Sequence, residues 1–198
     1  MKRDRRQIKT RNAILEACNQ LLETKSIEQI TINDIADTAN INRGTFYLHF
    51  KDKYEMITNF EDKMISLLHE TILKHVPNEQ FEQEFLPSRY DTIIEVFKCL
   101  EDNEQLLSFL IKLDFSTTFR KKLRQSLLTI IENSGIHHYK ELLHPIPVEL
   151  GVKIMTDTIL NVAEYTHETE KQWNKQEVAE TIFKSIIQGP AKTLGFIK

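Results

Sequence analysis

Glycine and proline are scarce in this chain of 198 residues, with five of each. Because these residues end or bend helices, their scarcity favours long uninterrupted helices. Alternating β-branched runs bounded by turn residues are missing, which argues against a β-sheet. No run of about 18 apolar residues is present, and the first residues lack the apolar region of a signal peptide. We therefore expect an all-α protein of the cytoplasm, without a membrane partner.

Cysteine and histidine patterns exclude several kinds of site. Cys18 and Cys99 form neither a CxxC motif nor a disulfide framework, so we expect reduced thiols in a helical core. His137, His138 and His144 lack the helical spacing with Asp or Glu that a metal site needs. The chain also has no GxSxG, Walker or HExxH motif. We expect no metal, no cofactor and no enzymatic activity, and turnover of any substrate would contradict this.

Charge is small overall but unevenly distributed. The net charge is −3, whereas residues 1–53 carry ten Lys or Arg against seven Asp or Glu, a net charge of +3. Most of this excess lies in residues 1–11, where six basic residues accompany only Asp4. Such a segment is either a solvated basic tail or a basic arm beside a DNA-reading element.

Helix signals near the N-terminus describe a helix-turn-helix inside a small bundle. Apolar residues recur at helical spacing over 5–24, and a capping box of Thr31 and Asp34 starts a short second helix. Asn42 can cap a third helix, so two short helices and a three-residue turn occupy about residues 31–50. Further helices are expected from about 52 to 75 and at 88–102, 103–113, 116–134, 148–169 and 174–189.

The segment RGTFYLHF, residues 43–50, gives the third helix two different faces. Phe46 and Phe50 fall one turn apart on one side, where they can enter the bundle core. The opposite side is slender at its centre and forms hydrogen bonds at its edges, which suits a helix lying in the major groove of DNA. Gly44, Thr45 and Leu48 lie at its centre, with Asn42, Arg43, Tyr47 and His49 at its edges.

Three residues of this outward face are candidates for contact with bases. Gly44 lets the helix backbone approach the base edges, Leu48 can touch a thymine methyl group, and Arg43 can donate a fork of hydrogen bonds to guanine. The ordinary alternative is that Leu48 packs in the bundle and Arg43 is a solvated charge. Their common position beside a basic segment favours the DNA-reading role.

Five polar residues are candidates for contact with phosphates. Thr45, Tyr47 and His49 can reach phosphate oxygens from the third helix. Thr31 and Lys53 each lie at the start of a helix, where backbone N–H groups also favour an anion. The alternatives are bundle packing for Tyr47, a satisfied hydrogen bond for His49 and a solvated charge for Lys53.

The pattern T-x-x-x-IA-x-x-A-x-I-x-x-GTFYLHF-x-x-K resembles the DNA-binding signature of the TetR family of bacterial transcriptional regulators, over about residues 8–57. Ser26 and Asn40 stand where that family usually has Gly, and Asn42 replaces a common Ser. Asn tolerates a left-handed turn and is also a good helix cap. The resemblance implies that the DNA-contacting positions are Thr31, Asn42, Arg43, Gly44, Thr45, Tyr47, Leu48, His49 and Lys53.

The resemblance also implies a division into two domains. Residues 1–52 would form a three-helix DNA-binding domain, and residues 53–198 an all-helical domain that binds a ligand and dimerises. Apolar stripes on the last two expected helices are candidates for a dimer interface, although they can equally be buried within one subunit. These interface candidates are Val152, Met155, Ile159, Val162, Val178, Ile182, Phe183 and Ile186.

We therefore expect a dimeric repressor that binds a palindromic DNA operator and responds to an unknown small-molecule inducer. The alternative is a coactivator of the same fold that a protein partner controls. The C-terminal part resembles a Firmicutes-type C-terminal domain of the family. Aromatic residues of this part either line an apolar inducer pocket or fill the core. They are Phe97, Phe109, Phe115, Phe119 and Tyr139.

Overall fold

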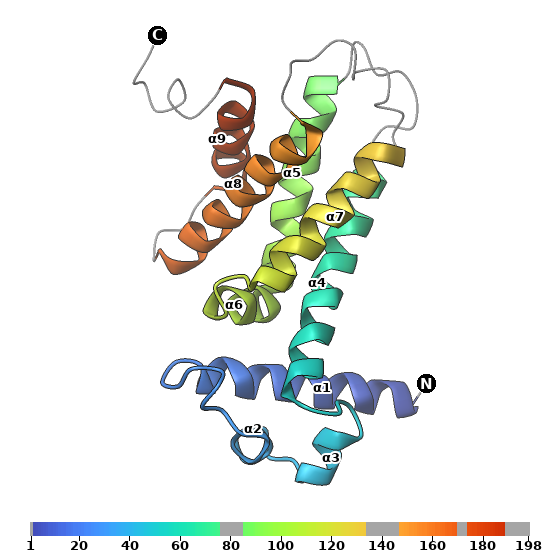
Figure 1. Ribbon diagram of the computed structural model, residues 1–198, viewed down its shortest axis with the longest axis vertical. Coiled ribbons are helices and arrows are strands. Elements are labelled where there is room, and N and C mark those ends of the chain that lie inside the picture. Colours follow the sequence, from blue (N-terminus) through green and yellow to red (C-terminus); the bar gives the residue numbers. More distant parts are fainter. Residues whose placement is uncertain (1, 76–84, 134–146, 170–173, 189–198) are drawn as a thin grey trace. The chain divides into compact units, whose positions relative to one another are not determined.

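All regular structure in the described residues is α-helical, as expected from the sequence (Figure 1). The computed structural model describes residues 2–75, 85–133, 147–169 and 174–188. None of the described helices combines the length and the apolar character that crossing a membrane requires. The helices are α1 (Lys2–Leu21), α2 (Ile32–Thr38), α3 (Arg43–Tyr47), α4 (Lys53–His75), α5 (Phe85–Asp102), α6 (Glu104–Lys112), α7 (Thr117–Asn133), α8 (Val148–Glu168) and α9 (Lys175–Gln188).

The turn between α2 and α3 is fixed by local hydrogen bonds. Beyond the end of α2, Asn40 adopts a left-handed conformation with φ of 52°. The N–H of Asn40 donates to the carbonyl of Asp37 (3.1 Å), and the N–H of Ile41 donates to the carbonyl of Ala36 (2.9 Å). This is a Schellman motif, which satisfies the last carbonyls of a helix. Asn42 follows as the cap of α3, so a turn of three residues reverses the chain.

The chain folds into two compact units, each with its own packed interior. The N-terminal unit comprises residues 1–64 and 103–116, and the C-terminal unit comprises residues 65–102 and 117–198. The expected domain boundary at residues 52 and 53 thus falls within the N-terminal unit, at the start of α4.

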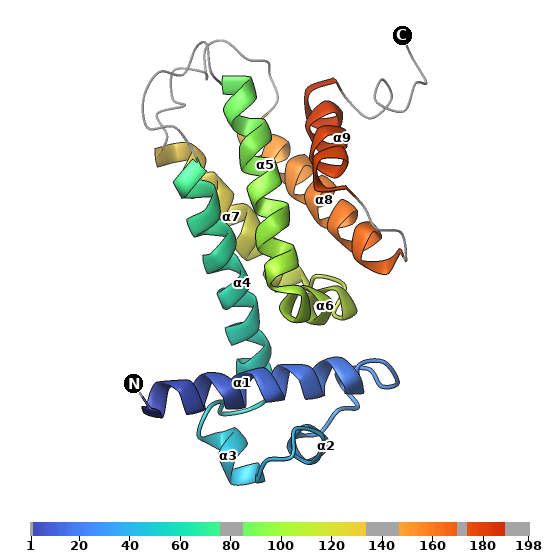
Figure 2. The same ribbon diagram turned by 180° about the vertical axis from the view of Figure 1, so that it is seen from behind.

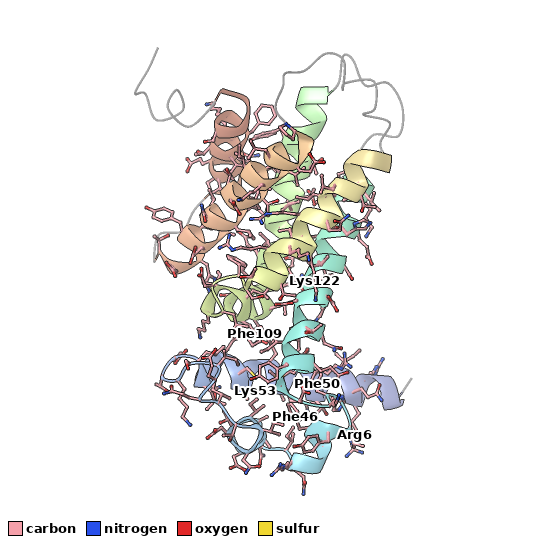
Figure 3. All side chains as sticks on the ribbon, in the orientation of Figure 1. Arg6, Phe46, Phe50, Lys53, Phe109 and Lys122 are labelled. Atoms are coloured by element: carbon pink, nitrogen blue, oxygen red, sulfur yellow. The ribbon has the colours of Figure 1, made fainter. Side chains whose placement is uncertain are left out.

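Aromatic side chains run through the core of the N-terminal unit. Phe46 and Phe50 of the α3 region are buried between α3 and α1 (Figure 3). Ring centroids are 5.7 Å apart between Phe46 and Phe50, 5.6 Å between Phe50 and Phe60, and 5.4 Å between Phe60 and Phe109. Such tilted and edge-on contacts stabilise a core beyond the area they bury. The core therefore joins α3, α4 and α6.

Helix α6 belongs to the N-terminal unit because it packs on α1. The side-chain amide of Asn19 donates to the carbonyl of Gln105 (2.8 Å), and the ammonium of Lys112 donates to the carbonyl of Asn19 (2.8 Å). After α6, the hydroxyl of Ser116 donates to the buried carboxylate of Glu61. Nothing in the sequence pattern indicated that a segment so far beyond the start of α4 would complete this core.

The C-terminal unit is a helical bundle in which α9 packs on α5 and α8, and α8 also packs on α7 (Figure 2). The guanidinium of Arg124 and the carboxylate of Asp157 are 2.8 Å apart and link α7 to α8. The rings of Tyr90 and Phe183 meet edge to face at 5.8 Å and link α5 to α9. The bundle therefore buries apolar stripes of both α8 and α9.

Candidate nucleic-acid interface

Helix α3 separates a buried face from an open one, as the sequence predicted. Phe46 and Phe50 have 0% and 1% of their surface exposed. On the other side Leu48 is 82% exposed, and Gly44 and Tyr47 are exposed as well. Burying a leucine stabilises a protein by about 1.5–3 kcal/mol. Leu48 gains little of this stabilisation from the protein's own core, so its side chain is available to a partner.

Gly44 has no role in the fold that explains why this position lacks a side chain. It lies in the first turn of α3, and its φ is not in the left-handed range. A Cβ atom placed there would meet only the Oδ1 atom of Asn42, at 3.4 Å. Glycine costs a helix about 1 kcal/mol relative to alanine. Packing inside the protein therefore does not require a glycine at this position.

Arg43 and Tyr47 form a pair on the exposed edge of α3. The Arg43 guanidinium donates to the Tyr47 hydroxyl over 3.1 Å, and its Cζ atom lies 5.5 Å from the centre of the Tyr47 ring. Residues four positions apart face each other on a helix, so this pair is held by local geometry. Both polar groups are thereby presented together on the edge of the open face.

Asn42 and Thr31 cap the two helices of the motif. The Asn42 Oδ1 atom accepts from the N–H of Gly44 (2.8 Å). The Thr31 hydroxyl accepts from the N–H of Asp34 (3.1 Å) and donates to the Asp34 carboxylate (2.6 Å). The hydroxyl and the N–H of Thr31, followed by Lys25, hold the pKa of Asp34 well below its usual value. Thr31 thus uses its hydroxyl proton within the protein, although the start of α2 stays exposed.

Lys53 differs most from what the resemblance implied. Its ammonium donates to three backbone carbonyls, those of Ile27 (2.8 Å), Glu28 (3.0 Å) and Ile30 (3.0 Å). An ammonium has three N–H donors, so each of them has a partner in the segment between α1 and α2. Through these bonds Lys53 ties that segment to the start of α4 (Figure 3).

His49 lies half-buried at the C-terminal end of α3, beside a cation from another helix. Burial lowers the pKa of His49, and the charge of Arg11 lowers it further. The Arg11 guanidinium lies over the Phe50 ring, 5.1 Å from its centre. The sequence reading missed Arg11 as a neighbour of this site because the contact joins two helices that lie far apart in the sequence. Thr45 is half-buried on the same helix as His49.

The aromatic residues expected around an inducer belong to both compact units. Phe109 and Phe115 belong to the N-terminal unit, where Phe109 packs on Phe60 as core. Phe97 and Phe119 are buried in the C-terminal unit. Tyr139 lies outside the described residues, as do His137, His138 and His144. No group of three metal-binding side chains occurs among the residues that the structure describes.

The residues expected at a dimer interface differ in how far they are exposed. Val152, Val178 and Ile182 are buried within the single chain, so they fill its own core instead of facing a second copy. Met155 is exposed. Four more were expected there: Ile159, Val162 and Phe183 are half-buried, and the side chain of Ile186 lies outside the described part. The sequence reading missed other exposed apolar residues of α8, namely Leu150, Ile154 and Tyr165.

Comparison with known proteins places these features in a family. The model of bacterial regulatory proteins of the tetR family matches residues 14–59, which span α2, α3 and parts of α1 and α4. A probable acrEF/envCD operon repressor of Escherichia coli (strain K12) is 28% identical over 79 residues, 38% of this chain and 36% of the relative. The regulator EthR of Mycolicibacterium smegmatis is 40% identical over 53 residues, 27% of this chain and 24% of the relative. The chain thus matches about a third or less of the length of these curated relatives.

Solved structures share the fold over most of the chain. The fatty acid degradation regulator FadR from Bacillus halodurans has a TM-score of 0.65 at 17% identity, covering 91% of this chain and 96% of its own. FadR from Bacillus subtilis, solved in complex with stearoyl-CoA, has a TM-score of 0.63 at 20% identity, covering 92% and 98%. These likenesses concern the fold alone, whereas the family match covers the helix-turn-helix itself. Residues 14–59 therefore carry the helix-turn-helix region of the tetR family of bacterial regulatory proteins.

Proposed function

We propose that this protein is a transcriptional regulator of the cytoplasm that binds double-stranded DNA as a homodimer and represses transcription. The open face of α3 is the observation that carries the proposal. A slender surface with an exposed Leu48, an uncovered Gly44 and a polar edge of Arg43 and Tyr47 fits the major groove. The family match over the same residues supports the same role.

Within the groove we assign the residues of α3 to two tasks. Leu48 contacts a thymine methyl group, and Arg43 donates to guanine, so these two side chains select bases. Tyr47, His49 and Thr45 contact phosphates and fix how the helix docks. Asn42 and Thr31 hold the starts of α3 and α2, whose backbone N–H groups face the same anions.

A second copy of the chain is the expected partner of the exposed apolar residues on α8. Leu150 and Ile154 lie one turn apart, and Met155 and Tyr165 continue the exposed apolar surface of the helix. A two-fold dimer presents two α3 helices and predicts a palindromic operator with half-sites about 34–36 Å apart. Release by an inducer requires that the inducer bind the DNA-free conformation more tightly than the DNA-bound one.

Selection of bound sequences from random duplex DNA tests the proposal. The full chain is expected to enrich a palindrome, and Leu48→Asp is expected to enrich no sequence because it places a charge in the groove. Leu73→Asp changes an exposed leucine of α4 and serves as the matched control. Failure of the wild-type protein to retain any duplex at low ionic strength would sink the proposal. Release of bound DNA by a protein alone would favour the coactivator alternative.

A further inference from the structure

Helix α1 extends beyond the part of the N-terminal unit that covers it. Its buried side chains begin with Ile14 and Leu15, whereas residues 5–9 are exposed on every side of the helix. Even Ile8, the apolar residue of this segment, has 54% of its surface exposed. Short stretches of helix in water depend mainly on packing for their stability. Contacts with the described parts of the protein do not supply that packing for residues 5–9.

The charges of this segment oppose a helix as well. Positions 2–9 hold five basic residues and one acidic residue. The positive end of the helix dipole disfavours cations in the first turns, and like charges three or four positions apart repel each other. The side chains of Arg5, Arg6 and Lys9 form no hydrogen bond or ion pair with any other side chain that the structure describes. The helix would be more stable without this cluster of basic residues. Its presence therefore points to an anionic partner.

The position of the cluster identifies the partner. Arg11 contacts Phe50 at the C-terminal end of α3, which places this half of α1 beside the DNA-reading helix. Arg6 precedes Arg11 by five residues, about 7.5 Å along the helix axis. Figure 3 shows Arg6 at the end of α1 that lies beside α3. A duplex held by α3 therefore passes beside this end of α1, where residues 5–9 are exposed on every side of the helix.

The contacts of Lys53 support the assignment of phosphate binding to the start of α1. The resemblance gave Lys53 the task of neutralising a phosphate, but its three donors are engaged with backbone carbonyls. The exposed guanidinium groups of Arg5 and Arg6 have no such engagement among the described residues. Guanidinium forks match two phosphate oxygens at once, which makes arginine well suited to this contact.

We propose that Arg5, Arg6 and Lys9 form a second contact surface that binds backbone phosphates flanking the bases read by α3. The proposal rests on the DNA binding proposed above and adds a site that α3 does not contain. Duplex DNA carries one negative charge per ~1.7 Å along its axis, so anions continue past the groove in which α3 lies. This surface adds affinity and salt dependence but no base preference.

The salt dependence of binding to the selected duplex tests this surface. In the triple variant Arg5→Gln/Arg6→Gln/Lys9→Gln, the slope of log affinity against log salt is expected to fall by about 2.7 per bound subunit. When the salt is raised from about 50 to about 200 mM, the ratio of wild-type to variant affinity is therefore expected to fall about 40-fold per subunit. The base preference is expected to stay unchanged. The control variant Lys63→Gln/Lys74→Gln/Lys121→Gln removes the same charge from exposed lysines of α4 and α7 and is expected to keep the wild-type slope.

Duplex length gives a second readout. Wild type is expected to bind a duplex extended well beyond the selected bases on each side more tightly than one trimmed to them, and the triple variant is expected to bind both equally. A wild-type slope in the triple variant would overturn this surface while leaving the proposed function intact. Equal slope losses in the triple and control variants would overturn it too, because net charge alone would explain them. If wild type binds no duplex, both proposals fail.

Discussion

Some side chains of the helix-turn-helix form hydrogen bonds that stabilise the fold, whereas others have no such internal role. Thr31 and Lys53, both expected at phosphates, direct their donors to the protein itself. Leu48 and Gly44 have no comparable internal role. The periodicity of RGTFYLHF was enough to predict which of its residues are buried. It could not predict the contacts of Lys53, because carbonyls far away in the sequence determine them.

Gly44→Ala separates folding from DNA binding. Because the added methyl group meets only Asn42 Oδ1 at 3.4 Å, we expect the free energy of unfolding to rise by about 0.5–1 kcal/mol through helix propensity. Binding to DNA is expected to weaken, because the methyl group occupies space that the bases need. Thermal unfolding and anisotropy titrations measure the two effects. Gln20→Ala, at an exposed position of α1, is the control, and unchanged DNA affinity in Gly44→Ala would contradict the assignment of this face.

Lys53→Met keeps most of the side-chain stem and removes the ammonium. We expect the N-terminal unit to lose about 1–3 kcal/mol of stability, because three backbone carbonyls lose a charged donor. The salt slope of DNA binding is expected to stay at the wild-type value, since the ammonium faces the protein. Denaturant unfolding and salt titrations are the measurements. A slope reduced by about one unit would show that Lys53 leaves its carbonyls for a phosphate.

At the scale of elements, the helices could be predicted to within a few residues because local signals set their ends. The capping box at Thr31 and the cap at Asn42 start α2 and α3 where expected. Asn40 takes the left-handed conformation that its residue type tolerates. The packing of α6 on α1 could not be predicted, because periodicity shows that a helix has an apolar face and not which helix covers it.

The capping box of α2 predicts a pH dependence. The folded pKa of Asp34 is lowered from 3.8, first by the Thr31 hydroxyl, then by the Thr31 N–H and by Lys25. A lowered folded pKa contributes stability above pH ~4 that is lost as the pH falls further. We expect Asp34→Asn to be less stable than wild type at neutral and mildly acidic pH, with a difference that shrinks below pH ~4. Urea unfolding across this range checks this. Asp37→Asn, on the same helix, is the control, and a difference that grows with acid would contradict the capping role.

At the scale of the whole molecule, the sequence could not distinguish an apolar stripe that fills a core from one that meets a second copy. Both give the same periodicity. The structure separates them by burial, since Val178 and Ile182 are enclosed while Ile154 has 58% of its surface exposed. The expected interface therefore moves from α9 toward the open face of α8.

Ile154→Asp tests that surface. We expect the variant to fold with nearly wild-type stability, because the side chain is exposed, and to sediment as a monomer. Binding to a palindromic duplex is expected to fall with dimer formation. Ile182→Ala, in contrast, is expected to lose about 2–5 kcal/mol of stability through a cavity. Analytical ultracentrifugation and thermal melts separate the two effects. An Ile154→Asp protein that remains dimeric would rule out this part of α8.

The membership of residues 103–116 in the N-terminal unit has a practical consequence for building chimaeric regulators. A cut after residue 64 transfers α1 to α3 to another C-terminal domain without α6. It leaves Phe60 and Asn19 facing whatever the host offers in place of Phe109 and Gln105. A graft that includes α6, or recreates its two contacts in the recipient, should preserve the fold of the helix-turn-helix. One that exchanges only the first stretch of chain should yield a destabilised, aggregation-prone hybrid.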